Sequence, residues 1–162
     1  MTYAIILMGV AGSGKTTIGL LLANKLGWKF YDADDFHTET NREKMSHGMP
    51  LTDHDRASWL TSLQELIHNN LQVETPFVLA CSALKESYRA LLKVDEQVKF
   101  IYLKGTYSEI EVRLKNRAEH YMPVKLLASQ FEILEEPQDA LVINIIQTPE
   151  EIIQIICKGL AL

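Results

Sequence analysis

A glycine-rich segment near the start of the chain has the residue types that bind a phosphate chain. Residues 9–16 read Gly-Val-Ala-Gly-Ser-Gly-Lys-Thr, which matches the pattern Gly-x-x-x-x-Gly-Lys-Ser/Thr. Glycines let successive backbone N–H groups converge on phosphate oxygens, and a helix that begins there adds its positive end. In such loops the lysine is a cation for the β- and γ-phosphates, and the hydroxyl holds Mg²⁺. We therefore predict a nucleotide site formed by Gly9, Gly12, Ser13, Gly14, Lys15, Thr16 and Thr17.

A short acidic segment supplies the carboxylates that phosphoryl transfer would use. Asp32, Asp34 and Asp35 directly follow a short candidate strand at residues 29–31. The carboxyl ends of parallel strands meet at one edge of a sheet, so this segment is expected near the phosphate loop. We predict that Asp32 contacts Mg²⁺ through water and that Asp34 orients the acceptor hydroxyl or takes its proton. A solvated acidic turn is the alternative interpretation.

Two common classes of phosphate-loop protein do not fit the chain. A GTPase would carry an Asn-Lys-x-Asp segment near a late strand, whereas residues 24–27 read Asn-Lys-Leu-Gly and come early. A typical motor ATPase would end another strand in an acidic residue that orders magnesium. The apolar run at residues 77–81 ends in Cys81 and Ser82 instead. Guanine recognition and a motor function are therefore not expected.

Apolar periodicity places the motif in an alternating α/β chain. Candidate strands are residues 3–8, 29–31, 77–81, 98–103 and 141–146, and candidate helices are 16–26, 53–70, 85–93, 108–116, 124–134 and 149–160. This alternation predicts a layered α/β fold with right-handed crossovers and ligands at the carboxyl ends of the strands. The polar stretches 32–52 and 117–123 are candidate segments that cover a ligand.

Length and composition bound the organisation. The 162 residues, 47% apolar and 23% charged, fit a single domain over residues 1–162 with a real core. A net charge of −5 gives no general attraction to nucleic acid or anionic lipid, and no apolar run is long enough for a membrane span. Cys81 and Cys157 are not spaced as metal ligands. We expect a protein of the reducing cytoplasm.

Longer motifs give the chain a recognisable family pattern. Residues 37–60 read HTETNREKMSHGMPLTDHDRASWL, and the pattern continues at 81–89, 100–103, 120–123 and 129–131. Over nearly its whole length the chain resembles the bacterial-type gluconokinases, small relatives of shikimate and adenylate kinases. It departs from their pattern at Thr38, His54 and Asn144.

This resemblance implies a specific fold and reaction. The fold would be the three-layer phosphate-loop kinase fold, a parallel five-stranded sheet with helices on both faces and a small mobile lid. The acceptor would bind at residues 32–60, and the lid would be residues 117–125. The reaction would be ATP-dependent phosphorylation of D-gluconate to 6-phospho-D-gluconate with Mg²⁺, by a cytoplasmic homodimer. The alternatives are another small-molecule or nucleoside monophosphate kinase, or a nucleotide-binding regulator without transfer chemistry.

A sugar acid needs cations for its carboxylate and mixed polar groups for its hydroxyls. Candidates for the carboxylate and for the phosphate in transfer are His37, Lys44, Arg56, Lys85 and Arg89, and candidates for the hydroxyls are Asp34, Asp55 and Ser82. Which of them pairs with which substrate group stays open, and ordinary surface ion pairs are the alternative. Trp59 begins an apolar helical stripe and is expected in the core.

Two further arginines precede the lid candidate. Arg113 and Arg117 are four residues apart and share one face of a helix. By analogy with the resembling kinases, Arg113 would stack on adenine, and Arg117 would neutralise charge in the transition state. The catalytic set implied for the family is then Lys15, Asp34 and Arg117. A solvated helix face paired with Glu109 and Glu111 is the alternative.

Overall fold

The computed structural model describes residues 3–116 and 125–162. Its centre is one parallel sheet of five strands. They are β1 (Ala4–Met8), β2 (Lys29–Asp32), β3 (Phe77–Ala80), β4 (Val98–Lys104) and β5 (Leu141–Asn144). The strand order is β2-β3-β1-β4-β5, so β1 lies in the middle and the carboxyl ends of all strands meet at one edge.

The central strand is buried on both faces. All residues of β1 are shielded from solvent, which fits a continuous apolar run in a covered parallel sheet. Ile5 and Leu7 point into one apolar cluster, and Ala4, Ile6 and Met8 point into the other. This alternation follows from the two-residue period of a strand, and it gives the protein two cores separated by the sheet.

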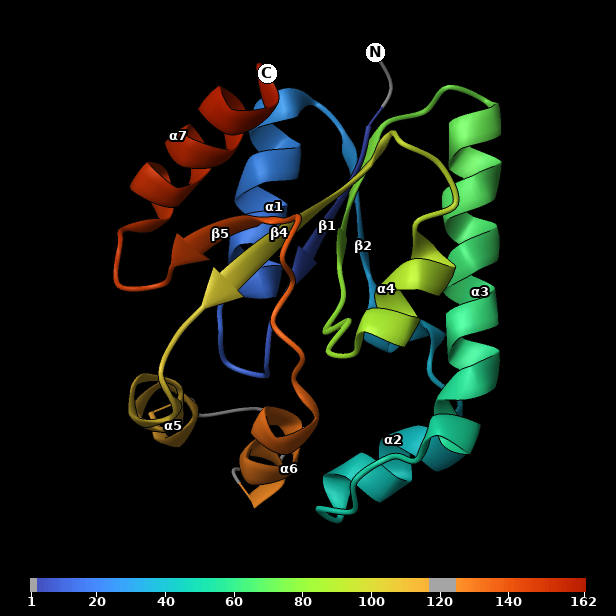
Figure 1. Ribbon diagram of the computed structural model, residues 1–162, viewed down its shortest axis with the longest axis vertical. Coiled ribbons are helices and arrows are strands. Elements are labelled where there is room, and N and C mark those ends of the chain that lie inside the picture. The colour runs from blue at the N-terminus through green and yellow to red at the C-terminus, as the bar shows by residue number, and fades with distance from the viewer. Residues whose placement is uncertain (1–2, 117–124) are drawn as a thin grey trace.

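Helices cover both faces and crowd the carboxyl edge (Figure 1). One face carries α1 (Lys15–Leu26) and α7 (Pro149–Leu160), and the other carries α3 (Asp53–Gln72) and α4 (Glu86–Leu92). The edge is flanked by η1 (Ala33–Phe36), α2 (Glu39–Ser46), α5 (Tyr107–Lys115) and α6 (Lys125–Ile133). In the part of the chain that the structure describes, no helix combines the length and apolar character of a membrane span.

The predicted three-layer α/β fold is confirmed. Each predicted strand and helix is present, and the bounds differ by a few residues at most. Helix α3 begins at a capping box in which Thr52 and Asp55 each bind the other's backbone N–H, and this fixes its predicted start.

One helix was missed. Residues 39–46 were expected only as part of a polar covering segment, because α2 buries just Asn41 and Met45 and shows no apolar stripe. The helix begins at an N-cap, because the Thr38 hydroxyl accepts a hydrogen bond from Asn41 N–H at 3.2 Å. Most of the predicted lid, residues 117–124, lies outside the described residues, and the division into an acceptor segment and a lid stays a prediction.

Candidate active site

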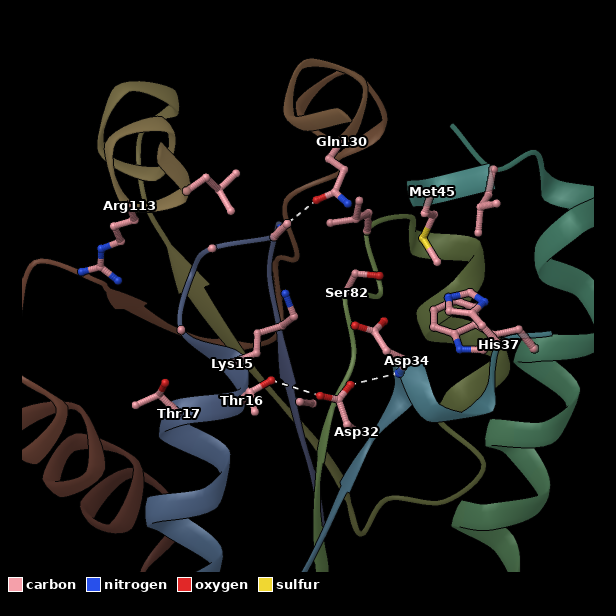
Figure 2. Close-up of a pocket in the computed structure, with 18 of the residues that line it drawn as sticks. Lys15, Thr16, Thr17, Asp32, Asp34, His37, Met45, Ser82, Arg113 and Gln130 are labelled. Atoms are coloured by element: carbon pink, nitrogen blue, oxygen red, sulfur yellow. Dashed lines mark hydrogen bonds between the residues drawn. The ribbon is translucent and has the colours of Figure 1, made fainter. Parts of the chain in front are cut away.

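A cavity of about 560 Å³ opens at the carboxyl edge of the sheet (Figure 2). This volume suits a small-molecule site. Predicted site residues that line it are Gly12, Gly14, Lys15, Thr16, Thr17, Asp32, Asp34, His37, Arg56, Ser82 and Arg113. The structure therefore brings most of the predicted nucleotide side and part of the predicted acceptor side to one cavity.

The phosphate loop between β1 and α1 needs glycine for its shape. Gly9 has φ of 150°, and a Cβ there would lie 2.9 Å from the carbonyl oxygen of Leu103. Gly14 caps α1 in the left-handed conformation, with φ of 97°. Gly9 and Ser13 do not line the cavity. They contribute to the shape of the loop on its side away from the cavity. The Ser13 hydroxyl is buried, with no hydrogen-bond partner among the described residues.

Lys15 folds back over this loop. Its ammonium donates to the carbonyl oxygens of Gly9 at 3.0 Å and Val10 at 2.9 Å. The charge is thereby held above the loop, at the start of helix α1, whose positive end would also attract an anion.

Two side chains that could ligate a metal ion through oxygen, Thr16 and Asp32, lie beside Lys15. The Thr16 hydroxyl donates to Asp32 Oδ2 at 3.1 Å, and Asp32 Oδ1 accepts from the backbone N–H of Asp34 at 3.0 Å. Mg²⁺ takes oxygen ligands, usually one or two from the protein, with waters and substrate phosphates completing its shell. Thr16 and Asp32 fit that role. No cluster of three or more acidic, histidine or cysteine ligands occurs among the residues that the structure describes.

The carboxylate of Asp34 faces the same space from the turn after β2. Figure 2 shows Lys15, Asp34 and Ser82 around this space, each from the segment that follows a different strand. The Ser82 backbone is tied to the phosphate loop, because its carbonyl accepts from Gly9 N–H at 3.3 Å. Neighbouring β1 and β3 thus place an acceptor-side hydroxyl next to the nucleotide side.

His37 lies flat on Trp59 at the wall of the cavity. The two rings stack with centroids 4.4 Å apart, and the Trp59 indole donates to the carbonyl oxygen of Ala33 at 2.7 Å. Burial lowers the pKa of His37 to about 4, and the charges of Arg56 and Arg42 lower it as well. A neutral His37 therefore faces the cavity at neutral pH. Trp59 is in the core, as predicted, and its ring also supports His37.

Arg56 is the acceptor-side cation that reaches the cavity. Its guanidinium donates to the carbonyl oxygen of Leu51 at 2.7 Å and to the Tyr88 hydroxyl at 3.3 Å, and it lies over the Tyr88 ring at 5.5 Å. The Tyr88 hydroxyl in turn donates to Asp53 Oδ1 at 2.5 Å. These contacts fix the guanidinium while leaving it at the cavity wall.

Two predicted cations are paired outside the cavity lining. Lys44 donates to both carboxylate oxygens of Asp55, at 2.9 and 3.0 Å, and Lys85 binds Asp53 at 3.0 Å. Hydrogen bonds from the Thr52 backbone and from Lys44 lower the pKa of Asp55 to about 2. Lys44, Asp55 and Lys85 therefore link α2, α3 and α4 in this structure.

Arg89, a candidate cation for the substrate, does not line the cavity. Its side chain is buried and donates to the carbonyl oxygens of Ala83 and Glu135, each at 2.7 Å, and to Glu86 at 3.1 Å. Helix α4 turns this side chain inward, away from the cavity. Its visible role is to hold the loop after β3, in which Ala83 adopts a φ of 44°.

Of the two arginines predicted to serve the nucleotide, the structure describes Arg113. Arg113 lines the cavity next to the phosphate loop, and its guanidinium donates to the carbonyl oxygen of Ile145 at 2.6 Å. Stacking on a base stays a prediction. Arg117 lies outside the described residues.

Several lining residues were not predicted. They are Ala11, Met45, Leu51, Trp59, Ala80, Leu84, Leu114, Asn116 and Gln130. Most are apolar walls that the sequence pattern could not separate from core. Gln130 is polar and touches the phosphate loop. It falls in the family pattern at residues 129–131, but that pattern gives no indication of a partner 119 positions away.

Comparisons with known proteins agree with this geometry. A family model described as shikimate kinase matches residues 11–159. A probable gluconokinase of Mus musculus is 46% identical over 93% of this chain and 87% of its own. A sugar kinase from Janibacter, solved without ligand, aligns with TM-score 0.93 and 39% identity over 99% of this chain and 95% of its own. A gluconokinase from Sinorhizobium meliloti aligns with TM-score 0.87 and 38% identity, over 98% and 91%.

The depressed pKa of His37 predicts a loss of stability in acid. In the unfolded chain His37 titrates near 6.5, whereas in the folded protein its pKa is about 4. Between these pH values the unfolded state binds the extra proton, so the free energy of unfolding falls as the pH is lowered. We expect the His37→Gln variant to lose less stability than the wild type between pH 6.5 and 4 in urea titrations. The exposed His68→Gln is the control, and equal slopes for all three proteins would contradict the prediction.

Proposed function

The chain belongs to the gluconokinases, within the shikimate kinase family, and from this membership we propose that its cavity transfers the γ-phosphoryl group of ATP to the terminal hydroxyl of gluconate. The protein is therefore an enzyme, a gluconokinase that forms 6-phosphogluconate. The observation that carries the assignment to this cavity is its two-sided lining. A phosphate loop occupies one side, and Asp34, His37 and Arg56 occupy the other.

On the nucleotide side, the chain holds phosphate mainly through backbone and Lys15. The glycine-shaped loop presents N–H groups to the phosphates, and the ammonium of Lys15 draws charge from the β- and γ-oxygens as the bond to the leaving oxygen breaks. Thr16 and Asp32 would hold Mg²⁺, which supplies charge neutralisation on the phosphates when bound. Arg113 would contact the nucleotide beside Gly14, and Arg117 would add positive charge at the transferred group.

On the acceptor side, Asp34 is the group that would position the hydroxyl. Its carboxylate would accept the hydroxyl proton and aim the oxygen at the γ-phosphorus, in line with the leaving group. Ser82 lies across the same space and would bind a further hydroxyl. Among the other predicted cations, Lys85 pairs with Asp53, Lys44 pairs with Asp55, and Arg89 binds backbone carbonyls. Arg56 would therefore bind the gluconate carboxylate.

Neutral His37 suits a polyhydroxy substrate. An uncharged imidazole has one donor and one acceptor nitrogen, and its Nδ1 is buried with no hydrogen-bond partner among the described residues. Stacking on Trp59 fixes the ring without using either nitrogen. We infer that His37 binds a gluconate hydroxyl, while the adjacent Arg56 supplies the charge.

Use of Mg²⁺, a cytoplasmic location and a homodimer also belong to this proposal. The Thr16–Asp32 pair supports the metal. The two thiols, Cys81 and Cys157, are free, which suits a reducing compartment. The dimer rests on the family resemblance.

The first experiment measures ADP release from MgATP with a panel of acceptors. We expect release that depends on gluconate, together with a product one phosphate heavier by mass spectrometry. Shikimate, neutral sugars and nucleoside monophosphates should give little, because none presents an open-chain sugar acid to Arg56 and Asp34. Turnover with one of these alone would replace the substrate assignment. No turnover with any of them would favour a nucleotide-binding regulator.

Removal of either proposed catalytic group should slow transfer strongly. We expect Asp34→Asn and Lys15→Met to lower kcat by about 10²- to 10⁴-fold, because a positioned base and a preorganised cation each contribute on that scale. Asp35→Asn is the matched control, since this neighbouring carboxylate is exposed and outside the cavity lining. Near-normal turnover in a folded Asp34→Asn protein would remove the proposed role.

Loss of the Arg56 charge should act on one substrate only. We expect Arg56→Gln to raise the KM for gluconate about 10- to 100-fold, the usual worth of a hydrogen bond to a charged group. The KM for MgATP should stay close to the wild-type value, because Arg56 lies on the acceptor side. An unchanged KM for gluconate would assign the carboxylate to another residue.

A further inference from the structure

A side chain from α6 binds the phosphate loop directly. The Oε1 atom of Gln130 accepts a hydrogen bond from the backbone N–H of Ala11 at 2.7 Å. Gln130 is 9% exposed, and it reaches from α6 to the loop at the edge of the cavity (Figure 2). A short, shielded bond between groups so far apart in sequence constrains the loop more than a local turn contact would.

Helix α6 is itself firmly anchored. Leu127 is fully buried in the apolar cluster that also contains Leu114 of α5. Phe131 packs against Tyr107, with ring centroids 5.4 Å apart. The amide of Gln130 is therefore carried by an element whose position is fixed by packing on α5 and the core.

The same helix also contacts the acceptor side. Leu126 packs with Met45 and Leu51, which lie on α2 and just before α3. Directly after α6, Glu135 N–H donates to the carbonyl oxygen of Leu84 at 2.8 Å, within the loop that carries Ser82. One short stretch of chain, residues 126–135, thus contacts both loops that border the cavity as well as the acceptor segment.

We propose that Gln130 is a positioning residue that holds the phosphate loop in its nucleotide-binding shape and ties it to the acceptor side through α6. The loop contains glycines with positive φ and has wide conformational freedom on its own. A loop already held in the bound shape loses less entropy when phosphate binds, which raises affinity without any contact from Gln130 to the nucleotide. The proposal deepens the kinase assignment and rests on it.

The test measures nucleotide binding without acceptor. Gln130→Met keeps the length of the side chain and removes the acceptor oxygen, and Gln130→Asn keeps the amide but is too short to reach Ala11. We expect each to weaken MgADP and MgATP binding in calorimetry by about 2- to 10-fold, the range of one net hydrogen bond. Exchange of the Ala11 amide should become faster in both. Glu132→Gln, an exposed change on the same helix, is the control and should match the wild type.

The outcomes separate this role from a purely structural one. A lower melting temperature with unchanged nucleotide affinity, or an unchanged exchange rate at Ala11, would overturn the proposal. Weaker nucleotide binding with a wild-type KM for gluconate would support it, because the bond acts on the phosphate loop. Because calorimetry with nucleotide alone does not involve gluconate, a failure of the acceptor assignment would leave this result readable.

Discussion

The pairing of β1 with both β3 and β4 is the constraint on which the site depends. Ile6 is opposite Leu79 on one side and Phe100 on the other, so β1 is locked in register across the whole sheet. A one-residue slip would move its side chains between the two cores, which makes the register costly to change. The phosphate loop therefore starts at a fixed point, and the segments after β2 and β3 begin beside it.

On the acceptor side, pairing of charges decides which cations can meet a substrate. Lys44 and Lys85 are each neutralised by an aspartate on α3, and Arg89 is used on backbone carbonyls. Arg56 is held by a carbonyl and a tyrosine, which fix its position without cancelling its charge. Ion pairs near the surface add little stability, so their main effect here is to orient α2, α3 and α4 around the cavity. The positive charge of Arg56 at the cavity wall, beside a neutral imidazole, suits an acidic, hydroxyl-rich acceptor.

The sequence was informative where chemistry follows from local spacing. The loop at residues 9–16, the strand before it and the helix after it form one continuous unit, and Asp32 ends the short strand β2 with Asp34 two residues later. The sequence was less informative where a side chain binds a residue that is far away along the chain. Nothing near Arg89 showed that it would turn inward to Glu135, and Gln130 gave no local sign of its bond to Ala11. Helix α2 was hidden for a related reason, since it buries too few apolar residues to show a period.

The two sides of the cavity differ in the groups that they present to a substrate, and this difference affects which acceptor can bind. On the nucleotide side, backbone groups whose shape is set by glycine and by the start of α1 act together with Lys15 and Thr16. The acceptor side consists of side chains from η1, α3 and the loop after β3, where a single substitution changes charge or hydrogen bonding. A fold of this kind can keep one phosphoryl donor and exchange acceptors. The contacts of α6 with both sides then matter for geometry, because transfer needs the two substrates held in line whichever acceptor is bound.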